Sequence, residues 1–248
     1  NNNDKALGTA FDYIDYLGTS DMTPEQVKSE FYRLACNFRV SPGNERTYVV
    51  LSGLNENMPE AMKLFEKLMA DAQVNKEAYT NMVADILKSR KDAKLNQMQN
   101  FRRLMNYGMY GPKSPATNIL TETELQTMDP QELTDRIHNQ NSYKHRIMYY
   151  GPTSEKELLA IINKNHQAPK KLKEIPVGNE FPRLETPVTK VLISPYEAKQ
   201  IYMTQLSNRG EKFDPMIEPS RQMYNEYFGG GMNSIVFQEM RESRGLAY

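Results

Sequence analysis

Two β-type runs joined by a very short connection constrain the fold of this chain more than any other feature. Residues 37–41 alternate polar and apolar side chains, and residues 47–54 are rich in β-branched residues. Pro42-Gly43-Asn44-Glu45, between them, is typical of a turn. So short a connection joins only antiparallel neighbours, because parallel strands need a crossover of about a dozen residues or more. The sequence therefore predicts an antiparallel hairpin over 37–54.

Amphipathic helices are predicted on both sides of this hairpin. In residues 4–17, Ala6, Ala10, Ile14 and Leu17 recur at the spacing that places them on one helix face. A second helix, 24–35, is predicted from the Thr-Pro-Glu-Gln start that forms a capping box. Further helices are predicted at 59–72, 76–107, 121–128, 130–139, 154–165, 215–228 and 233–244. A loop is predicted at 108–117, and strands at 144–150, 190–194 and 200–205.

This order of elements predicts an α+β fold in which helices pack on one face of a largely antiparallel sheet. Residues 168–187 contain four Pro and no hydrophobic period, which is typical of a linker. We therefore expect a complete domain at 1–167, a linker at 168–188, and the start of a second, similar domain at 189–248. The first residues and the last ones both look cut, so we expect a piece of a longer protein.

Composition excludes several classes of protein. Apolar residues make up 39% and charged residues 25%, which is typical of a chain with a packed core. A mean hydropathy of -0.71, with no apolar run of about 18 residues, excludes an integral membrane protein. Lys plus Arg and Asp plus Glu both number 31, so a uniformly basic nucleic-acid binder is disfavoured. Cys36 is the only cysteine, and we predict that it is a small buried hydrophobe.

The sequence carries no metal or nucleotide motif at the spacing that such sites require. His138, His145 and His166 each lack a second His or Cys at zinc-site spacing, so no metal site is predicted. Three glycines at 229–231 follow a helix rather than a strand, which indicates a connection between helices and not a phosphate loop. No G-x-S-x-G occurs, and we assign Ser234 to the first turn of a helix.

The segment 227–248 carries the most specific signal. Its sequence, YFGGGMNSIVFQEMRESRGLAY, closely resembles the "LGGG-SS-LFQ-IRE-RGLAY" segment of the pitrilysin-like zinc metallopeptidases, or inverzincins. That family includes insulin-degrading enzyme, mitochondrial processing peptidase and many bacterial zinc peptidases. FDYIDYLGT at 11–19 resembles the family's first-helix segment, with Gly18 and Thr19 matching its Gly-Thr. Residues 54–65 resemble the family's segment after the hairpin, and 143–152 its strand before the linker.

The resemblance implies tandem α+β domains paired into two halves that close like a clamshell. In the active half, H-x-x-E-H supplies two zinc ligands and a general base. Aligned on the Gly-Thr pair, those positions fall on Thr9, Asp12 and Tyr13, and residues 87–92, where the family places a later Glu ligand, hold only charged surface residues. The resemblance therefore implies the non-catalytic C-terminal half of a bacterial-type protein, with zinc in the partner half and no cofactor here.

The resemblance also implies a role for Arg241 and Tyr248, which are seven residues apart. In the family's C-terminal half, an Arg and a Tyr at this spacing reach across to the zinc site of the other half. Guanidinium and phenol donors can stabilise the oxyanion of a tetrahedral intermediate. Without the resemblance, the local sequence predicts a helix-surface ion pair for Arg241 and a core strand position for Tyr248.

The function implied is a catalytically inactive half that encloses a chamber for unfolded peptides, opposite a zinc-bearing half in the same polypeptide or in a partner chain. Alone, such a chain neither binds zinc stoichiometrically nor cleaves peptides. Two alternatives stay open: a non-enzymatic structural or binding subunit of the same fold, and an unrelated α+β binding module. An H-x-x-E-H upstream in the parent protein would favour the inactive half of a zinc peptidase over the non-enzymatic subunit. By resemblance only, the periplasm or cell envelope is the expected compartment, and no nucleic acid is expected as a partner.

Overall fold

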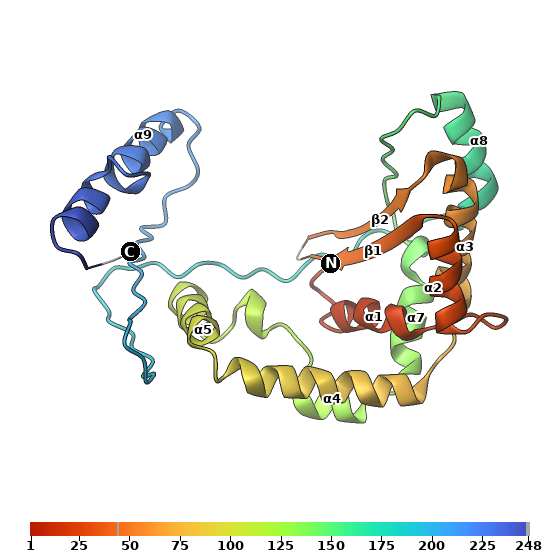
Figure 1. Ribbon diagram of the computed structural model, residues 1–248, viewed down its shortest axis with the longest axis horizontal. Coiled ribbons are helices and arrows are strands. Elements are labelled where there is room, and N and C mark those ends of the chain that lie inside the picture. The colour runs from red at the N-terminus through yellow and green to blue at the C-terminus, as the bar shows by residue number, and fades with distance from the viewer. Residues whose placement is uncertain (44, 247–248) are drawn as a thin grey trace. The chain divides into compact units, whose positions relative to one another are not determined.

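The computed structural model describes residues 1–43 and 45–246, so Asn44, Ala247 and Tyr248 lie outside the described residues (Figure 1). The chain forms two compact units, one of residues 1–184 with 190–206, the other of residues 185–189 with 207–248. Each unit is described separately below. The boundaries expected from the sequence, at 1–167, 168–188 and 189–248, stay predictions.

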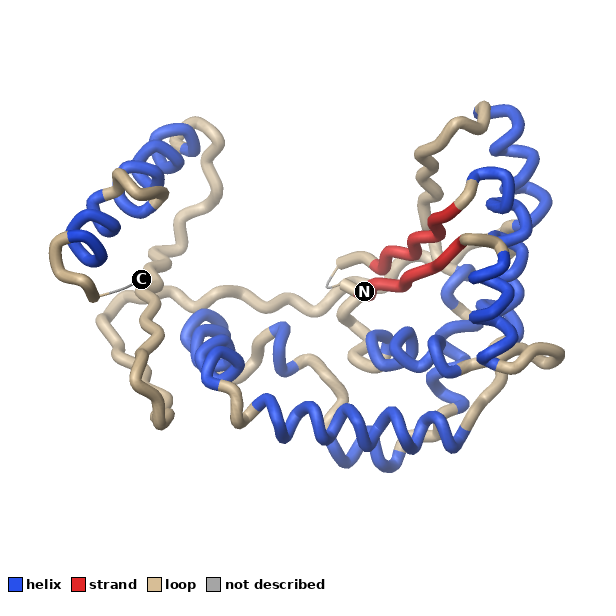
Figure 2. The backbone as a smooth tube through the Cα atoms, viewed as in Figure 1, coloured by secondary structure: helices blue, strands red, loops and turns tan. Residues whose placement is uncertain are grey.

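Helices make up most of the regular structure, and one short hairpin supplies the strands (Figure 2). The first unit contains α1 (Leu7–Tyr13), η1 (Ile14–Tyr16), α2 (Pro24–Arg33), β1 (Cys36–Pro42), β2 (Thr47–Gly53), η2 (Asn55–Asn57), α3 (Met58–Asp71), α4 (Lys76–Ala93), α5 (Gln97–Tyr110), η3 (Pro115–Thr117), α6 (Glu122–Thr127), α7 (Gln131–His138), η4 (Gln140–Ser142) and α8 (Glu155–Asn165). The second contains α9 (Glu218–Gly229) and the π-helical η5 (Phe237–Glu242). Within the described residues, no helix has the length and apolar content needed to cross a membrane.

The predicted antiparallel hairpin is confirmed. Strand β1 pairs with β2 in a register that runs from Cys36 opposite Gly53 to Pro42 opposite Thr47. Helices α1, α2 and α3 all contact this hairpin. The Phe38 ring of β1 lies between Phe31 of α2, at 5.0 Å, and Phe65 of α3, at 5.2 Å between ring centroids. The α+β class with helices on one sheet face is therefore confirmed, although the sheet has two strands in the described residues.

The core forms where the sequence pattern places it. The four residues predicted to share one face of the first helix, Ala6, Ala10, Ile14 and Leu17, are all buried. They join Leu133 and Ile137 of α7, Leu68 of α3 and the other buried apolar residues in one cluster. Burying each large aliphatic side chain of this kind contributes about 1.5–3 kcal/mol. Cys36 is buried in the same cluster, as predicted.

Capping boxes begin three of the helices at the predicted positions. At α2 the Gln26 backbone N–H donates to the Thr23 hydroxyl, and the Thr23 N–H donates back to the Gln26 side chain. Thr121 with Glu124 caps α6 and Ser154 with Glu157 caps α8 in the same way. Each cap satisfies backbone donors that the first helical turn leaves free, and contributes about 1 kcal/mol.

Gly18 and Thr19 form the tight turn between η1 and α2. The Thr19 N–H donates to the Met22 carbonyl at 2.8 Å, and the Gly18 carbonyl accepts from the Gln73 N–H at 2.9 Å. A Cβ on residue 18 would lie 2.2 Å from the Met22 carbonyl oxygen. The backbone comes so close here that only glycine fits. This turn therefore fixes the end of the first helical segment against the C-terminal end of α3.

The single helix predicted at 76–107 is wrong, because Asn96 begins a new helix. The Asn96 side chain accepts from the Gln99 N–H at 3.0 Å, so the chain forms α4 and α5 as separate helices. Asparagine favours this cap position because its short side chain competes for backbone donors. The second helix continues to Tyr110, so the loop predicted at 108–117 begins late. It starts at Gly111, whose φ of 73° ends the helix.

The strands predicted at 144–150, 190–194 and 200–205 are wrong. The first makes only one bridge at its start, between Tyr143 and Lys173. In the other two, apolar side chains stay exposed, for example Ile193 at 79% and Ile201 at 89%. Alternation of side chains predicts a strand only where a neighbour pairs with its backbone and covers one face. No such neighbour lies beside these segments in the described residues.

Candidate functional site

Helix α1 carries Thr9, Asp12 and Tyr13, the positions that the resemblance assigns to a degenerate zinc motif. Positions separated by three and four residues lie on one face of a helix. Tyr13 is fully buried, Thr9 is half-buried and Asp12 is exposed. The three side chains therefore differ strongly in environment, although they lie on neighbouring turns.

The Tyr13 hydroxyl ties α1 to the start of α4. It donates to the Asn75 carbonyl at 2.6 Å and accepts from the Asn75 N–H at 2.9 Å. The side chain of Asn75 in turn caps α4 by accepting from the Ala78 N–H. The Tyr13 ring also packs edge-on against Tyr79, with ring centroids 5.7 Å apart. Burial raises the pKa of the Tyr13 phenol. Position 13 therefore has a structural role that a metal ligand could not share.

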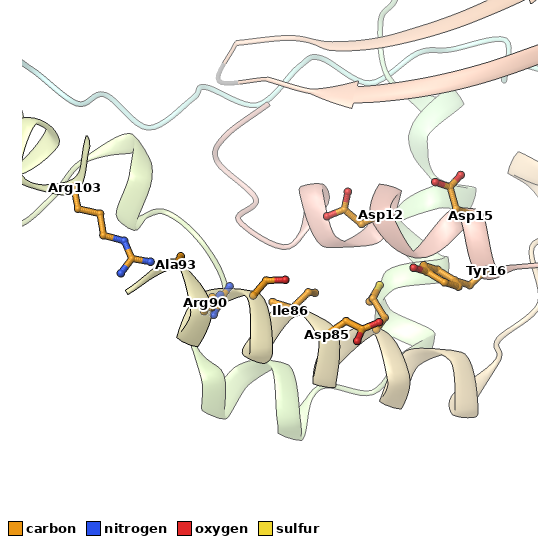
Figure 3. Close-up of a pocket in the computed structure, with 10 residues that line it drawn as sticks. Asp12, Asp15, Tyr16, Asp85, Ile86, Arg90, Ala93 and Arg103 are labelled. Carbon is orange, nitrogen blue, oxygen red and sulfur yellow. The ribbon is translucent and has the colours of Figure 1, made fainter. Parts of the chain in front are cut away.

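A cavity of about 520 Å³ lies beside this face of α1 (Figure 3). It is lined by Asp12, Asp15, Tyr16, Met82, Asp85, Ile86, Ser89, Arg90, Ala93 and Arg103. Most of these residues belong to α4, while Arg103 comes from α5 and lies at the opposite end of the cavity from Asp15 and Tyr16. The structure therefore brings Asp12 together with Ser89 and Arg90, which belong to the 87–92 segment where the family's later ligand was expected.

The cavity holds charges of both signs. Burial, and then repulsion from Asp15, raises the pKa of Asp12. Burial also raises the pKa of Asp15, against a smaller opposing effect of Lys28. Arg90 and Arg103 make no ion pair within the described residues, so their donors can reach a ligand. The cavity is suited to polar groups, and in the described part of the chain no three His, Cys, Asp or Glu side chains gather closely enough to hold a metal.

The raised pKa values of the cavity carboxyls predict a specific pH dependence. For the carboxyls of Asp12 and Asp15, the pKa in the folded state lies above the pKa in the unfolded state. The contribution of each carboxyl to stability is therefore highest below about pH 3.8 and falls as the pH rises through its folded-state pKa. We expect Asp12→Asn to raise the free energy of unfolding at pH 7, by less than about 1 kcal/mol because solvent screens exposed charges, and to leave it unchanged at pH 3. Urea unfolding at both pH values measures this.

Asp71→Asn is the matched control, because hydrogen bonds from Ser20 lower the pKa of that carboxyl. Its substitution should lower stability at pH 7, and the loss should shrink as the pH falls below 3.8. If Asp12→Asn instead lowers the free energy of unfolding at pH 7, burial is not the dominant effect on the pKa of Asp12.

Arg241 lies in the second unit, on η5. Its guanidinium stacks over the Phe237 ring at 4.8 Å from the centroid, and its Nε lies 3.9 Å from Glu242 Oε1. The side chain is 45% exposed. Its donors are therefore largely uncommitted. Tyr248 lies outside the described residues, and the proposed roles of both residues stay predictions.

Sequence reasoning missed one polar cluster, formed by Glu66 of α3 with His145 and His166. The two histidines are 21 residues apart in sequence, and their Nε2 atoms lie 2.8 Å apart. Glu66 is buried and contacts His166. The strand predicted at 144–150 places His145 on a strand, and the helix predicted at 154–165 places His166 at its end. His166 does cap α8, but His145 lies on an irregular segment. No sequence spacing indicates a contact that depends on how α8 packs against α3.

Comparison with models of protein families finds no match, and comparison with curated proteins finds none. Solved structures, in contrast, match with high probability. A protease from Helicobacter pylori aligns with a TM-score of 0.61 and 11% identity, over 98% of this chain and 59% of that protein. The M16 peptidase inactive domain from Pseudomonas fluorescens aligns with a TM-score of 0.59 and 14% identity, over 98% and 60%.

The periplasmic protease PqqL from Escherichia coli aligns with a TM-score of 0.57 and 13% identity, over 72% of this chain and 20% of that protein. This chain therefore spans between a fifth and three fifths of the solved proteins it matches. Identities this low establish the fold alone. The chain has the α+β fold of the M16, or pitrilysin-like, peptidases, which confirms the resemblance at the level of fold.

Proposed function

We propose that this chain is a catalytically silent part of a zinc peptidase that holds unfolded peptide opposite a zinc-bearing half. One observation carries the proposal: a chain with the fold of an M16 inactive domain has Thr9, Asp12 and Tyr13 where an active half carries H-x-x-E-H. Tyr13 is buried and bonded to the backbone of Asn75, so it is committed to the fold. Zinc binding and water activation therefore fall to the other half.

The hairpin supports the peptide-binding part of the proposal. In the described residues β1 and β2 pair only with each other, so each has a free edge of backbone donors and acceptors. Tyr48, Val49 and Val50 of β2 are about half exposed. An extended peptide adds to such an edge as a further strand, with backbone hydrogen bonds that do not depend on its sequence. This mode suits a peptidase that accepts many unfolded substrates.

The test compares the chain alone with its parent protein. Both are incubated with a mixed pool of unfolded peptides, with and without a chelator, and the products are followed by mass spectrometry. The chain alone is expected to cleave nothing. The parent is expected to cleave, and to lose its activity when the chelator is added, because the proposal places the catalytic zinc in the other half.

The incubation of the chain alone and that of the parent protein can each contradict the proposal. Chelator-sensitive cleavage by the chain alone would overturn catalytic silence. A parent protein without H-x-x-E-H and without cleavage would instead favour a structural or binding subunit of the same fold. Peptide binding by the chain alone, measured by fluorescence anisotropy, separates a peptide-holding domain from a scaffold that contacts only a protein partner.

The compartment belongs to the same proposal. One protein of this fold, PqqL, is a periplasmic protease. We propose the periplasm or cell envelope for the parent of this chain, and fractionation of cells followed by immunodetection checks it.

A further inference from the structure

The cluster of Glu66, His145 and His166 is a polar site that the proposed function leaves unexplained. It joins three segments of the first unit: α3, the stretch after η4, and the C-terminal end of α8. The His145 and His166 rings meet edge-on, with their planes at 82° and their centroids 4.9 Å apart. The Nε2 atoms of the two rings face each other at 2.8 Å.

The outer nitrogen of each ring is fixed by an acceptor. His145 Nδ1 lies 2.7 Å from the Tyr143 carbonyl oxygen, and a carbonyl oxygen only accepts, so Nδ1 carries the hydrogen. His166 Nδ1 lies 2.5 Å from Glu66 Oε1 and donates to that carboxylate. The other Glu66 oxygen accepts from the Asn141 amide at 2.8 Å and from the Gln167 N–H at 3.3 Å. Glu66 is therefore held in place by three donors.

This arrangement directs two lone pairs at one point. In a neutral imidazole whose Nδ1 carries the hydrogen, Nε2 is an acceptor. Two such acceptors at 2.8 Å repel each other unless a proton on one Nε2 atom or a metal ion lies between them. In metal sites, ligating histidines donate the other ring N–H to a carboxylate or a backbone carbonyl, which orients the ring and fixes the tautomer. Both of these acceptors are present here.

We propose that His145 and His166 bind a divalent transition metal through their Nε2 atoms, with Glu66 and the Tyr143 carbonyl as orienting partners. Metal–nitrogen bonds of about 2.0–2.1 Å at a tetrahedral angle place two ligand nitrogens about 3.3 Å apart. The pair must therefore open by about 0.5 Å. His145 can supply this movement, because it is exposed and lies on an irregular segment. Water completes the coordination.

Among the metals that imidazole ligands suit, Ni²⁺ and Cu²⁺ are expected here, because this chain alone is not expected to bind zinc stoichiometrically. With two protein ligands the site is weaker than a structural zinc centre, which almost always has four. A bound metal would clamp the stretch after η4 to the end of α8. The site is formed by other residues of the first unit than the α1 motif, and it does not depend on the proposed function.

The test is calorimetric titration of the metal-free full chain with NiCl₂, beside the Cu²⁺ EPR spectrum. We expect one Ni²⁺ per chain and nitrogen coupling in the Cu²⁺ spectrum. His145→Ala and His166→Ala should each weaken binding at least tenfold, and Glu66→Gln by about 10–100-fold. His138→Ala is the matched control, because that histidine contacts the Ala72 carbonyl and should not affect metal affinity.

Identical titration curves for the unchanged chain and His145→Ala would overturn the proposal, as would a Cu²⁺ spectrum that His145→Ala leaves unchanged. Circular dichroism checks that each variant is folded, and the exposed position of His145 makes its substitution the safest one. The double variant His145→Ala with His166→Ala separates this site from α1. Ni²⁺ that still binds the double variant with unchanged affinity would overturn the two-histidine site, whereas loss of Ni²⁺ binding in the double variant supports it.

Discussion

Replacing Tyr13 by alanine is expected to lower the free energy of unfolding of this chain by about 3–5 kcal/mol, the usual cost of removing a buried aromatic side chain. Tyr13 of α1 is fully buried and contacts the start of α4, so its removal leaves a cavity in the packed core. The loss also breaks both hydrogen bonds to Asn75, at the residue that caps α4. Chemical denaturation followed by circular dichroism measures the effect.

Tyr13→Phe separates the hydroxyl from the ring. It keeps the packing against Tyr79 but leaves the Asn75 N–H and carbonyl without the hydroxyl, so we expect a loss of about 1–3 kcal/mol. Tyr16→Phe is the control, since Tyr16 is 43% exposed and its substitution should change stability by less than about 0.5 kcal/mol. Equal effects of the two substitutions would contradict the role assigned to the Tyr13 hydroxyl.

The same residue occupies one of the positions that the resemblance assigns to a degenerate zinc motif on α1. A zinc-binding histidine needs one ring nitrogen directed at the metal, but position 13 directs its polar atom at the backbone of Asn75. The Asp12 carboxyl lines the cavity, where burial raises its pKa. A histidine placed at position 13 would therefore remove a structural contact.

Local features of this fold could be predicted from the sequence because short-range chemistry determines them. The box of Thr23 and Gln26 begins α2 through hydrogen bonds between residues three apart, and the short turn after Pro42 makes the hairpin antiparallel. The buried face of the first helix follows from spacing alone. Each of these signals is complete within about a dozen residues of sequence.

The missed features depend on partners far away in sequence. Residues 190–194, KVLIS, have the apolar and β-branched side chains of a strand, but a strand also needs a neighbour, and none pairs with that segment in the described residues. The contact between His145 and His166 arises because α8 packs on α3, so neither residue predicts the other. The break at Asn96 had a local signal, an asparagine cap, which the charge pattern of the segment concealed.

In the parent protein, Arg241→Ala is expected to lower kcat by about 10²–10³-fold if Arg241 donates to the oxyanion, the effect of losing one such donor. The π-helical turn at 237–242 positions this side chain, and π-helical turns are frequent at functional sites. Stacking on Phe237 holds the guanidinium plane, while the contact with Glu242 at 3.9 Å is too long to occupy its donors. The fork of N–H groups is therefore oriented but free to bind.

Arg241→Lys tests the geometry of that fork. A lysine keeps the charge but not the planar pair of donors, so we expect an intermediate loss in kcat with little change in KM. Arg244→Ala, an exposed arginine three residues further along the chain, should leave both constants unchanged. If Arg241→Ala instead raises KM and leaves kcat intact, Arg241 binds the substrate peptide in its ground state. If neither constant changes, Arg241 is the helix-surface residue that its local sequence predicts.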